Sequence, residues 1–280
     1  MSRKTALVIS VVLLLILVVP GFFAPENLPP SSGTLGYLGP GAAPPLGTDE
    51  LGRPLMAYAL QGAKIVAMPA LAAALLVLLL GTVAGLLACT GQPKLATLVQ
   101  GLGEIVGSLP RFLVVLVVAL VIAGGMKVGQ QATLLPIALT WGLLSAPGAM
   151  DEAGAVSARL GGARFVEALR AHGFSRTRIY LFHVVGLNLR PVVVRHAAET
   201  LMHVVFLEIS LSYLCTLPPQ PASLTHGDSL HSWAELLQMG YRWVIDPVRS
   251  PSLHALLLGL GLLGLVVGLS FSLRAASRAR

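Results

Sequence analysis

Four charged side chains lie inside long apolar segments of the sequence. A charge in hydrocarbon is costly, so such residues usually face protein or a water-filled cavity and often mark a substrate or ion pathway. They are Arg111, Arg195, Glu199 and Glu208. Each is therefore a candidate for function within a membrane.

Arg111 directly follows Pro110. Because proline lacks an N–H group, a helix is weakened at this point. A cation at such a kink can line a pathway and attract an anionic group such as a peptide carboxylate. Alternatively, Arg111 extends toward the membrane surface or pairs with a partner subunit.

Two further pairs suggest polar contacts on one helix. Arg195 and Glu199 are spaced i,i+4, which allows them to pair with each other. His196 and His203 lie seven residues apart on one helix face. They indicate either a metal pathway or polar packing against a neighbouring helix.

The sequence supports no other chemistry. It has no Gly-x-x-x-x-Gly-Lys-Ser/Thr segment, the phosphate-binding loop of many ATPases. No Ser/His/Asp set or paired carboxylates indicate covalent or acid–base catalysis. Cys89 and Cys215 lack the spacing of metal ligands. We therefore expect no enzymatic activity, no metal site and no cofactor in this chain.

The composition indicates a membrane protein. Of 280 residues, 55% are hydrophobic and 11% charged, whereas a soluble domain has about 25% charged residues. The net charge of +7 does not indicate nucleic-acid binding, because the basic residues flank apolar segments instead of forming one soluble patch.

Six apolar stretches are long enough to cross the ~30 Å hydrocarbon core, which takes roughly 20 helical residues. We therefore predict an all-α integral membrane protein with about six spans. The first stretch has no small-x-small cleavage site and is expected to be a retained anchor, not a signal peptide. The stretches cover 6–23, 65–88, 105–123, 132–149, 191–217 and 253–273, with polar residues interrupting the fifth.

Lysine and arginine are enriched in cytoplasmic loops. Their distribution places both termini and residues 150–190 in the cytoplasm, with residues 218–252 outside. We divide the chain into an anchor helix (1–23), an outer segment (24–62) and a membrane core (63–280). The outer segment is rich in Pro and Gly, which favours turns and extended chain. Three aromatic residues of the later outer loop are typical of the membrane interface: Trp233, Tyr241 and Trp243.

Residues 164–171, in the inner segment, have the pattern of a short amphipathic helix that Gly173 can end as a C-cap. A second helix can follow from Ser175, whose hydroxyl can cap its first turn. Two interpretations fit this element: a docking site for a soluble partner, or a helix lying on anionic headgroups. Its apolar side consists of Phe165, Val166 and Leu169.

Within this element, Glu167, Ala168 and Leu169 are followed after three residues by Gly173. The spacing resembles the Glu-Ala-Ala…Gly signature of the membrane subunits of ATP-binding-cassette (ABC) importers. Other segments resemble the second permease subunit of the dipeptide, oligopeptide and nickel group, in the same order along nearly the whole chain. They are PLGTDELGR (45–53), GAK (62–64), GSLP (107–110), Pro147-Gly148, LEISLSYL (207–214), Pro218-Pro219 and Ser232-Trp233.

The resemblance implies a fold like that of type I importers and a permease subunit that forms half of a pathway for peptides or a related small solute. Glu208 occupies the family's acidic position near the outer end of the fifth span, and with Arg111 it is a pathway candidate. An ATPase subunit would bind the element at about 164–182, through Arg164, Phe165, Val166, Glu167, Ala168, Leu169 and Gly173.

The partners implied are a second homologous permease subunit, two ATPase subunits and an extracytoplasmic substrate-binding protein. ATP and Mg would be held by the ATPase subunits. The location implied is the bacterial plasma (inner) membrane.

The sequence also departs from the family pattern. Asp151 and Glu152 stand where the family has basic residues, Arg111 stands where a small residue is usual, and Leu169 replaces the second alanine of the signature. These departures leave the substrate open. They also allow an alternative from another class, a non-transporting scaffold that anchors a soluble complex at the membrane.

Overall fold

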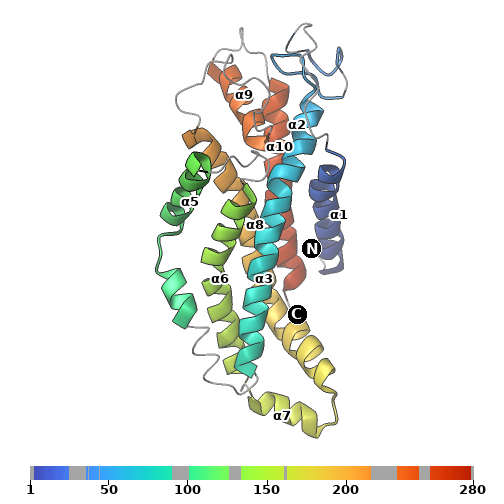
Figure 1. Ribbon diagram of the computed structural model, residues 1–280. Helices are drawn as coiled ribbons and strands as arrows, with labels where there is room; N and C mark the ends of the chain where they lie inside the picture. The colour runs from blue at the N-terminus through green and yellow to red at the C-terminus, as the bar shows by residue number, and fades with distance from the viewer. Residues whose placement is uncertain are drawn as a thin grey trace.

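The computed structural model describes residues 3–24, 36, 38–43, 45–89, 101–125, 134–160, 163–215, 232–245 and 253–278. Helices dominate this part of the chain and form an elongated bundle (Figure 1). An all-α fold is thus confirmed for the described residues. Outside them lie Lys94, Lys127, Pro218-Pro219 and most of the predicted outer loop 218–252.

The helices follow one another along the chain, with two wider π-helical stretches labelled η. The first group is α1 (Arg3–Phe22), α2 (Leu55–Gly62), η1 (Ala63–Ala67) and α3 (Met68–Cys89). A short helix, Gly101–Gly107, then precedes α5 (Arg111–Gly125). The remaining elements are α6 (Leu134–Arg159), α7 (Ala163–Ala171), η3 (Arg178–Leu189), α8 (Arg190–Cys215), α9 (Trp233–Ile245) and α10 (Leu253–Ser277).

Three helices of the described chain are long and apolar enough to cross a membrane: Lys4–Phe22, Leu55–Cys89 and Leu253–Ser277. They correspond to the first, second and sixth predicted spans. The second is longer than expected, because α2, η1 and α3 form one helical stretch of 35 residues. The expectation of turns and extended chain is thus wrong for residues 55–62, which contain strong helix formers such as Leu, Met and Ala.

The third predicted span is broken. Gly101–Gly107 and Arg111–Ile122 are apolar enough together to cross a membrane, but they are bent by 75°. The break lies at residues 108–110 and ends with Pro110, which cannot donate the hydrogen bond that would continue a helix. With this pair counted as one span, the described chain has four candidates.

The fourth and fifth predicted spans are both helices, but neither is among the described helices that are long and apolar enough to cross a membrane. Asp151, Glu152 and Arg159 lie in the last turns of α6. The α8 helix is continuous and carries Arg190, Arg195, Glu199 and Glu208. The structure therefore leaves six spans as a prediction.

The main core lies where α1, α3, α6, α8 and α10 pack together. Small residues allow the backbones of α3 and α6 to approach closely, since a Cβ atom on Gly142 would lie only 3.0 Å from the carbonyl oxygen of Ala73. The α1 and α10 helices lie side by side, joined by a hydrogen bond of 2.9 Å between the hydroxyls of Ser10 and Ser272.

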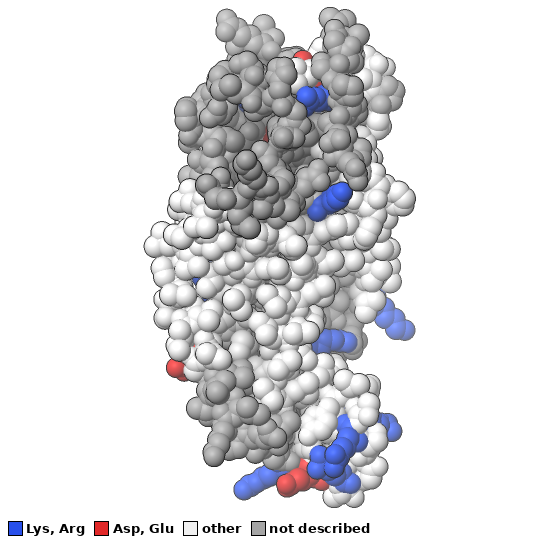
Figure 2. Space-filling view, in the orientation of Figure 1, with Lys and Arg blue, Asp and Glu red and all other residues white. Residues whose placement is uncertain are grey.

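The two ends of the bundle differ. The α1 helix begins and the α10 helix ends on the side from which α7 projects, whereas α9 lies at the opposite end (Figure 1). On the face shown in Figure 2, lysine and arginine gather over the α7 end, and the middle is mainly uncharged. The start of α1 and the end of α10 thus point toward the end that carries residues 150–190, while the side of the membrane on which this end lies stays a prediction.

Candidate functional site

The α7 helix ends as the sequence predicts. Gly173 has a φ of +79°, in the left-handed region that glycine enters without steric cost. Its N–H donates to the carbonyl oxygen of Arg170 (2.8 Å), and the N–H of Phe174 donates to that of Leu169 (3.2 Å). These two bonds form a Schellman motif, which turns the chain sharply out of the helix.

The apolar side of α7 packs on its own chain. Val166 is only 4% exposed and belongs to a cluster with Cys89, Ile179 and Val184, and Leu169 packs against this cluster. Arg164, Glu167, Ala168 and Arg170 are exposed. The side chain of Phe165 lies outside the described residues. A partner would therefore meet a charged surface with small residues, while Val166 holds α7 to the bundle.

The chain after Gly173 is helical, as predicted. The hydroxyl of Ser175 accepts a hydrogen bond from the N–H of Arg178 (3.4 Å). The guanidinium group of Arg178 lies over the ring of Phe174, 4.9 Å from its centre. The helix continues through η3 into α8, so α7 lies at the tip between α6 and this second arm.

The exposed arginines around this tip form a basic patch, which we define as Arg164, Arg170, Arg176 and Arg178. Glu167 is the exposed acidic residue of α7.

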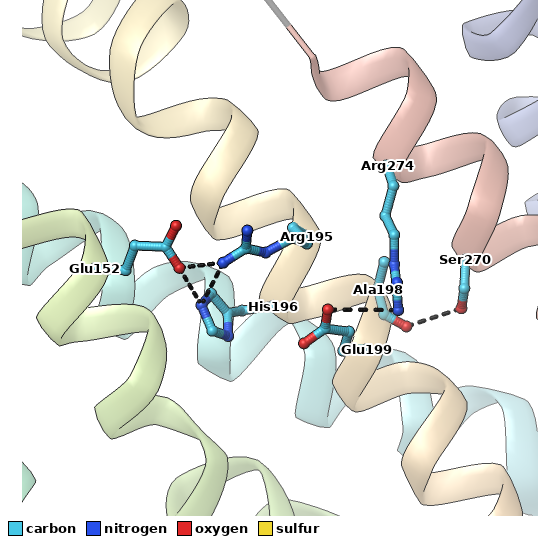
Figure 3. Close-up of polar contacts among 7 residues, drawn as sticks. All are labelled: Glu152, Arg195, His196, Ala198, Glu199, Ser270 and Arg274. Atoms are coloured by element: carbon cyan, nitrogen blue, oxygen red, sulfur yellow. Dashed lines mark hydrogen bonds and ion pairs between the residues drawn. The ribbon is translucent and has the colours of Figure 1, made fainter. Parts of the chain in front are cut away.

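A second polar cluster joins the two arms (Figure 3). The carboxylate of Glu152, on α6, accepts a hydrogen bond from the guanidinium group of Arg195, on α8. The same oxygen lies 3.0 Å from Nε2 of His196. This cluster accounts for the acidic residue at position 152, because α8 presents two basic side chains to it.

On the other side of α8, Glu199 pairs with Arg274 of α10 at 3.5 Å. One residue earlier, the carbonyl oxygen of Ala198 accepts a hydrogen bond of 2.9 Å from Ser270 of α10 (Figure 3). The suggested pairing of Arg195 with Glu199 is thus replaced by contacts to two different helices. Interhelical partners prevail because α6 presents a carboxylate to Arg195 and α10 presents a guanidinium group to Glu199.

The histidines of α8 pack against α6. His196 contacts Glu152, and the ring of His203 meets that of Trp141 edge-on, with 6.1 Å between centres. Within the described residues, no group of three or more His, Cys, Asp or Glu side chains could hold a metal ion. The geometry agrees with polar helix packing, the second of the two alternatives.

The two pathway candidates have opposite environments. Arg111 is exposed at the start of α5, next to the break. Glu208 is only 5% exposed and accepts a hydrogen bond from Ser212 (3.3 Å). Ser232 lies against the same carboxyl group, whose Oε2 has no hydrogen-bond partner among the described residues. Glu208 therefore joins α8 to the start of α9 in this structure.

The outer segment contains a hydrogen-bonded turn that residue spacing alone did not predict. Oδ1 of the buried Asp49 accepts from the N–H groups of Leu51 (2.9 Å) and Arg53 (2.7 Å), and Oδ2 accepts from the hydroxyl of Tyr58 (2.6 Å). Gly52 has a φ of +74°, as the turn requires. The sequence signal was the polar run between Gly47 and Arg53.

This turn docks on α9. Glu50 pairs with Arg242 at 3.5 Å. Trp233 donates from Nε1 to the carbonyl oxygen of Ala59 (3.2 Å). A Cβ atom on Gly62 would lie 2.1 Å from the Trp233 ring, so only glycine fits there. Trp233 is therefore a buried packing residue, not an interfacial one; the side chain of Trp243 lies outside the described residues.

No protein-family model matches this chain, and no curated protein matches it.

Proposed function

We propose that this chain is a permease subunit of an ABC importer and forms half of a translocation pathway for peptides or a related small solute. The observation that carries the proposal is α7, a short helix that projects from one end of an apolar bundle and ends at Gly173. The order of the sequence motifs supports the same family.

The surface of α7 favours a protein partner over lipid headgroups. An interfacial helix needs an exposed apolar face to insert into the membrane. Among the α7 side chains that the structure describes, Val166 is buried against the bundle, and the exposed ones are charged or small. A docked protein can use such a surface through hydrogen bonds and ion pairs.

The position of α7 also suits the transmission of movement. It is the tip of two arms, α6 and η3–α8, that run into the bundle. Val166 belongs to the apolar cluster that includes Ala153 of α6 and Ile179 and Val184 of η3, and Leu169 packs against this cluster. A partner that pulls on α7 would therefore move both helices. Alternating access would follow when closure of the ATPase subunits re-packs the spans.

The proposed complex has six spans in each permease subunit, with α7 in the cytoplasm of a bacterium. The basic patch supports this orientation, because positive residues are enriched on the cytoplasmic side. Two ATPase subunits would bind ATP and Mg, a second homologous permease would complete the pathway, and a binding protein would deliver the solute from outside.

The test is isolation of the chain from its native membrane with its bound subunits. We expect ATPase subunits to co-purify and their ATP hydrolysis to rise when the loaded binding protein is added. Stable association of soluble proteins without any ATP hydrolysis would instead indicate the scaffold.

A further inference from the structure

The break before α5 leaves polar backbone without helical partners. In hydrocarbon every backbone N–H and C=O group must be paired, so an irregular segment occurs at membrane depth only where protein or water covers it. The first intrahelical bond of α5 runs from the N–H of Val114 to the carbonyl oxygen of Pro110. The N–H groups of the three residues between them therefore have no preceding turn to bind.

The other side of the break is partly satisfied. The N–H groups of Ser108 and Leu109 donate to the carbonyl oxygens of Glu104 and Val106, and the Ser108 hydroxyl donates to that of Ile105. These contacts complete the end of the short helix, but they do not provide acceptors for the N–H groups at the beginning of α5. The break as a whole lies beside the middle of α6 and not at an end of the bundle (Figure 1).

Little of the described part of the chain covers the break. Residues 107–113 are all exposed, with Leu113 at 57%. Contact with α6 comes from one side, where a Cβ atom on Gly107 would lie 3.6 Å from Cβ of Pro147. Lipid cannot satisfy polar backbone on the open side.

The break also carries a positive charge, that of Arg111. Arg111 is exposed directly after Pro110, and a lipid-facing guanidinium group in mid-membrane would be costly. The open side of the break thus carries a charge beside backbone N–H groups at a helix start, and both suit water better than hydrocarbon.

We infer that residues 107–111 form the wall of an aqueous path through the membrane, and that Arg111 makes this wall cationic and favourable to anionic solutes. This aqueous wall rests on the proposed function, because it requires the chain to span the membrane, and it is the part of the chain that would face the path.

The test uses single cysteines in the assembled complex, after Cys89 and Cys215 are replaced by serine. Ser108→Cys places a thiol in the break. Leu79→Cys is the matched control, because Leu79 is 58% exposed on the unbroken α3 helix. Each thiol is treated with two water-soluble thiosulfonates of similar size, one anionic and one cationic.

We expect both reagents to modify the cysteine at 108 and neither to modify that at 79. The charge of Arg111, at about 6 Å in water, should raise the rate of modification by the anionic reagent roughly threefold and lower that by the cationic reagent roughly threefold. The anionic reagent should therefore react about tenfold faster than the cationic one. Arg111→Gln should remove this preference. An unreactive cysteine at 108 would overturn the aqueous path, and equal rates for the two reagents would overturn the role of Arg111.

This result is separable from the proposed function. A reactive cysteine at 108 in a complex that hydrolyses no ATP would keep the aqueous path and reject the importer. ATP-driven uptake with an unreactive cysteine at 108 would keep the importer and reject the aqueous path at residues 107–111.

Discussion

The carboxylate of Glu152 on α6 binds the guanidinium group of Arg195 on α8, 43 residues farther along the chain. The contact joins the two arms that meet at α7, so it fixes the arms relative to each other between the tip and the core. His196 adds a second basic group to the same oxygen.

Exchange of the two charges tests this link. Arg195 is 44% and Glu152 33% exposed, so water screens the pair and we expect it to stabilise the fold by about 1 kcal/mol or less. Glu152→Arg or Arg195→Glu alone places like charges together and should lower the thermal midpoint in detergent. The double exchange should recover most of the loss, and a double variant no better than the worse single one would contradict the pairing.

Replacement of Gly173 tests the coupling element. A Cβ atom there would meet nothing within 4 Å, so a substitution acts only through the left-handed backbone. Valine resists this conformation at a cost of about 2 kcal/mol, whereas asparagine tolerates it. We expect Gly173→Val to remain in the membrane but to lose ATPase co-purification or coupled uptake, with Gly173→Asn close to wild type. Normal uptake by Gly173→Val would show that this segment does not couple.

Substitutions in the outer turn should affect stability in a graded way. Asp49→Ala leaves two N–H groups and the Tyr58 hydroxyl without their acceptor, for which we expect a loss of roughly 3 kcal/mol. Tyr58→Phe removes only one of these bonds and should cost about 1 kcal/mol. Denaturant unfolding in detergent, followed by protease sensitivity of the outer segment, provides the measurement. Equal losses for the two variants would mean that the turn does not depend on the Asp49 carboxylate.

Impermeant thiol reagents can test the orientation. In a background without Cys89 and Cys215, we expect Tyr241→Cys to be labelled in intact cells and Ala158→Cys only after permeabilisation, because the two lie at opposite ends of the bundle and both are exposed. Ser157 is unsuitable, since it is buried and donates to the carbonyl oxygen of Gly85. Labelling of Ala158→Cys from outside would reverse the topology.

Arg111 can be tested in transport itself. If its charge lines the path, Arg111→Gln should reduce uptake of a singly charged anionic solute by roughly threefold while subunit yield stays normal, and Arg111→Lys should retain most of the uptake. Loss of assembled complex in Arg111→Gln would show that the arginine instead binds a partner subunit. Uptake and yield should be measured on the same membranes.

The sequence by itself determined that the chain consists of apolar helices, and it determined local features such as the end of α7. Apolar runs of about 20 residues have few folds available other than a helix in lipid, because their backbone must pair within the segment. Gly173 was likewise predictable, since a glycine after an amphipathic turn favours a left-handed C-cap through local sterics alone. The helix after Ser175 and the weakness at Pro110 follow from equally local rules.

Only the tertiary structure decided which polar groups meet. The i,i+4 spacing of Arg195 and Glu199 predicts a pair, yet each finds a partner on another helix, because α6 presents a carboxylate to Arg195 and α10 presents a guanidinium group to Glu199. Trp233 has an interfacial pattern, yet Gly62 provides the close approach that buries it. The partners in both cases are distant in sequence, and helical periodicity carries no information about which faces of separate helices will pack together.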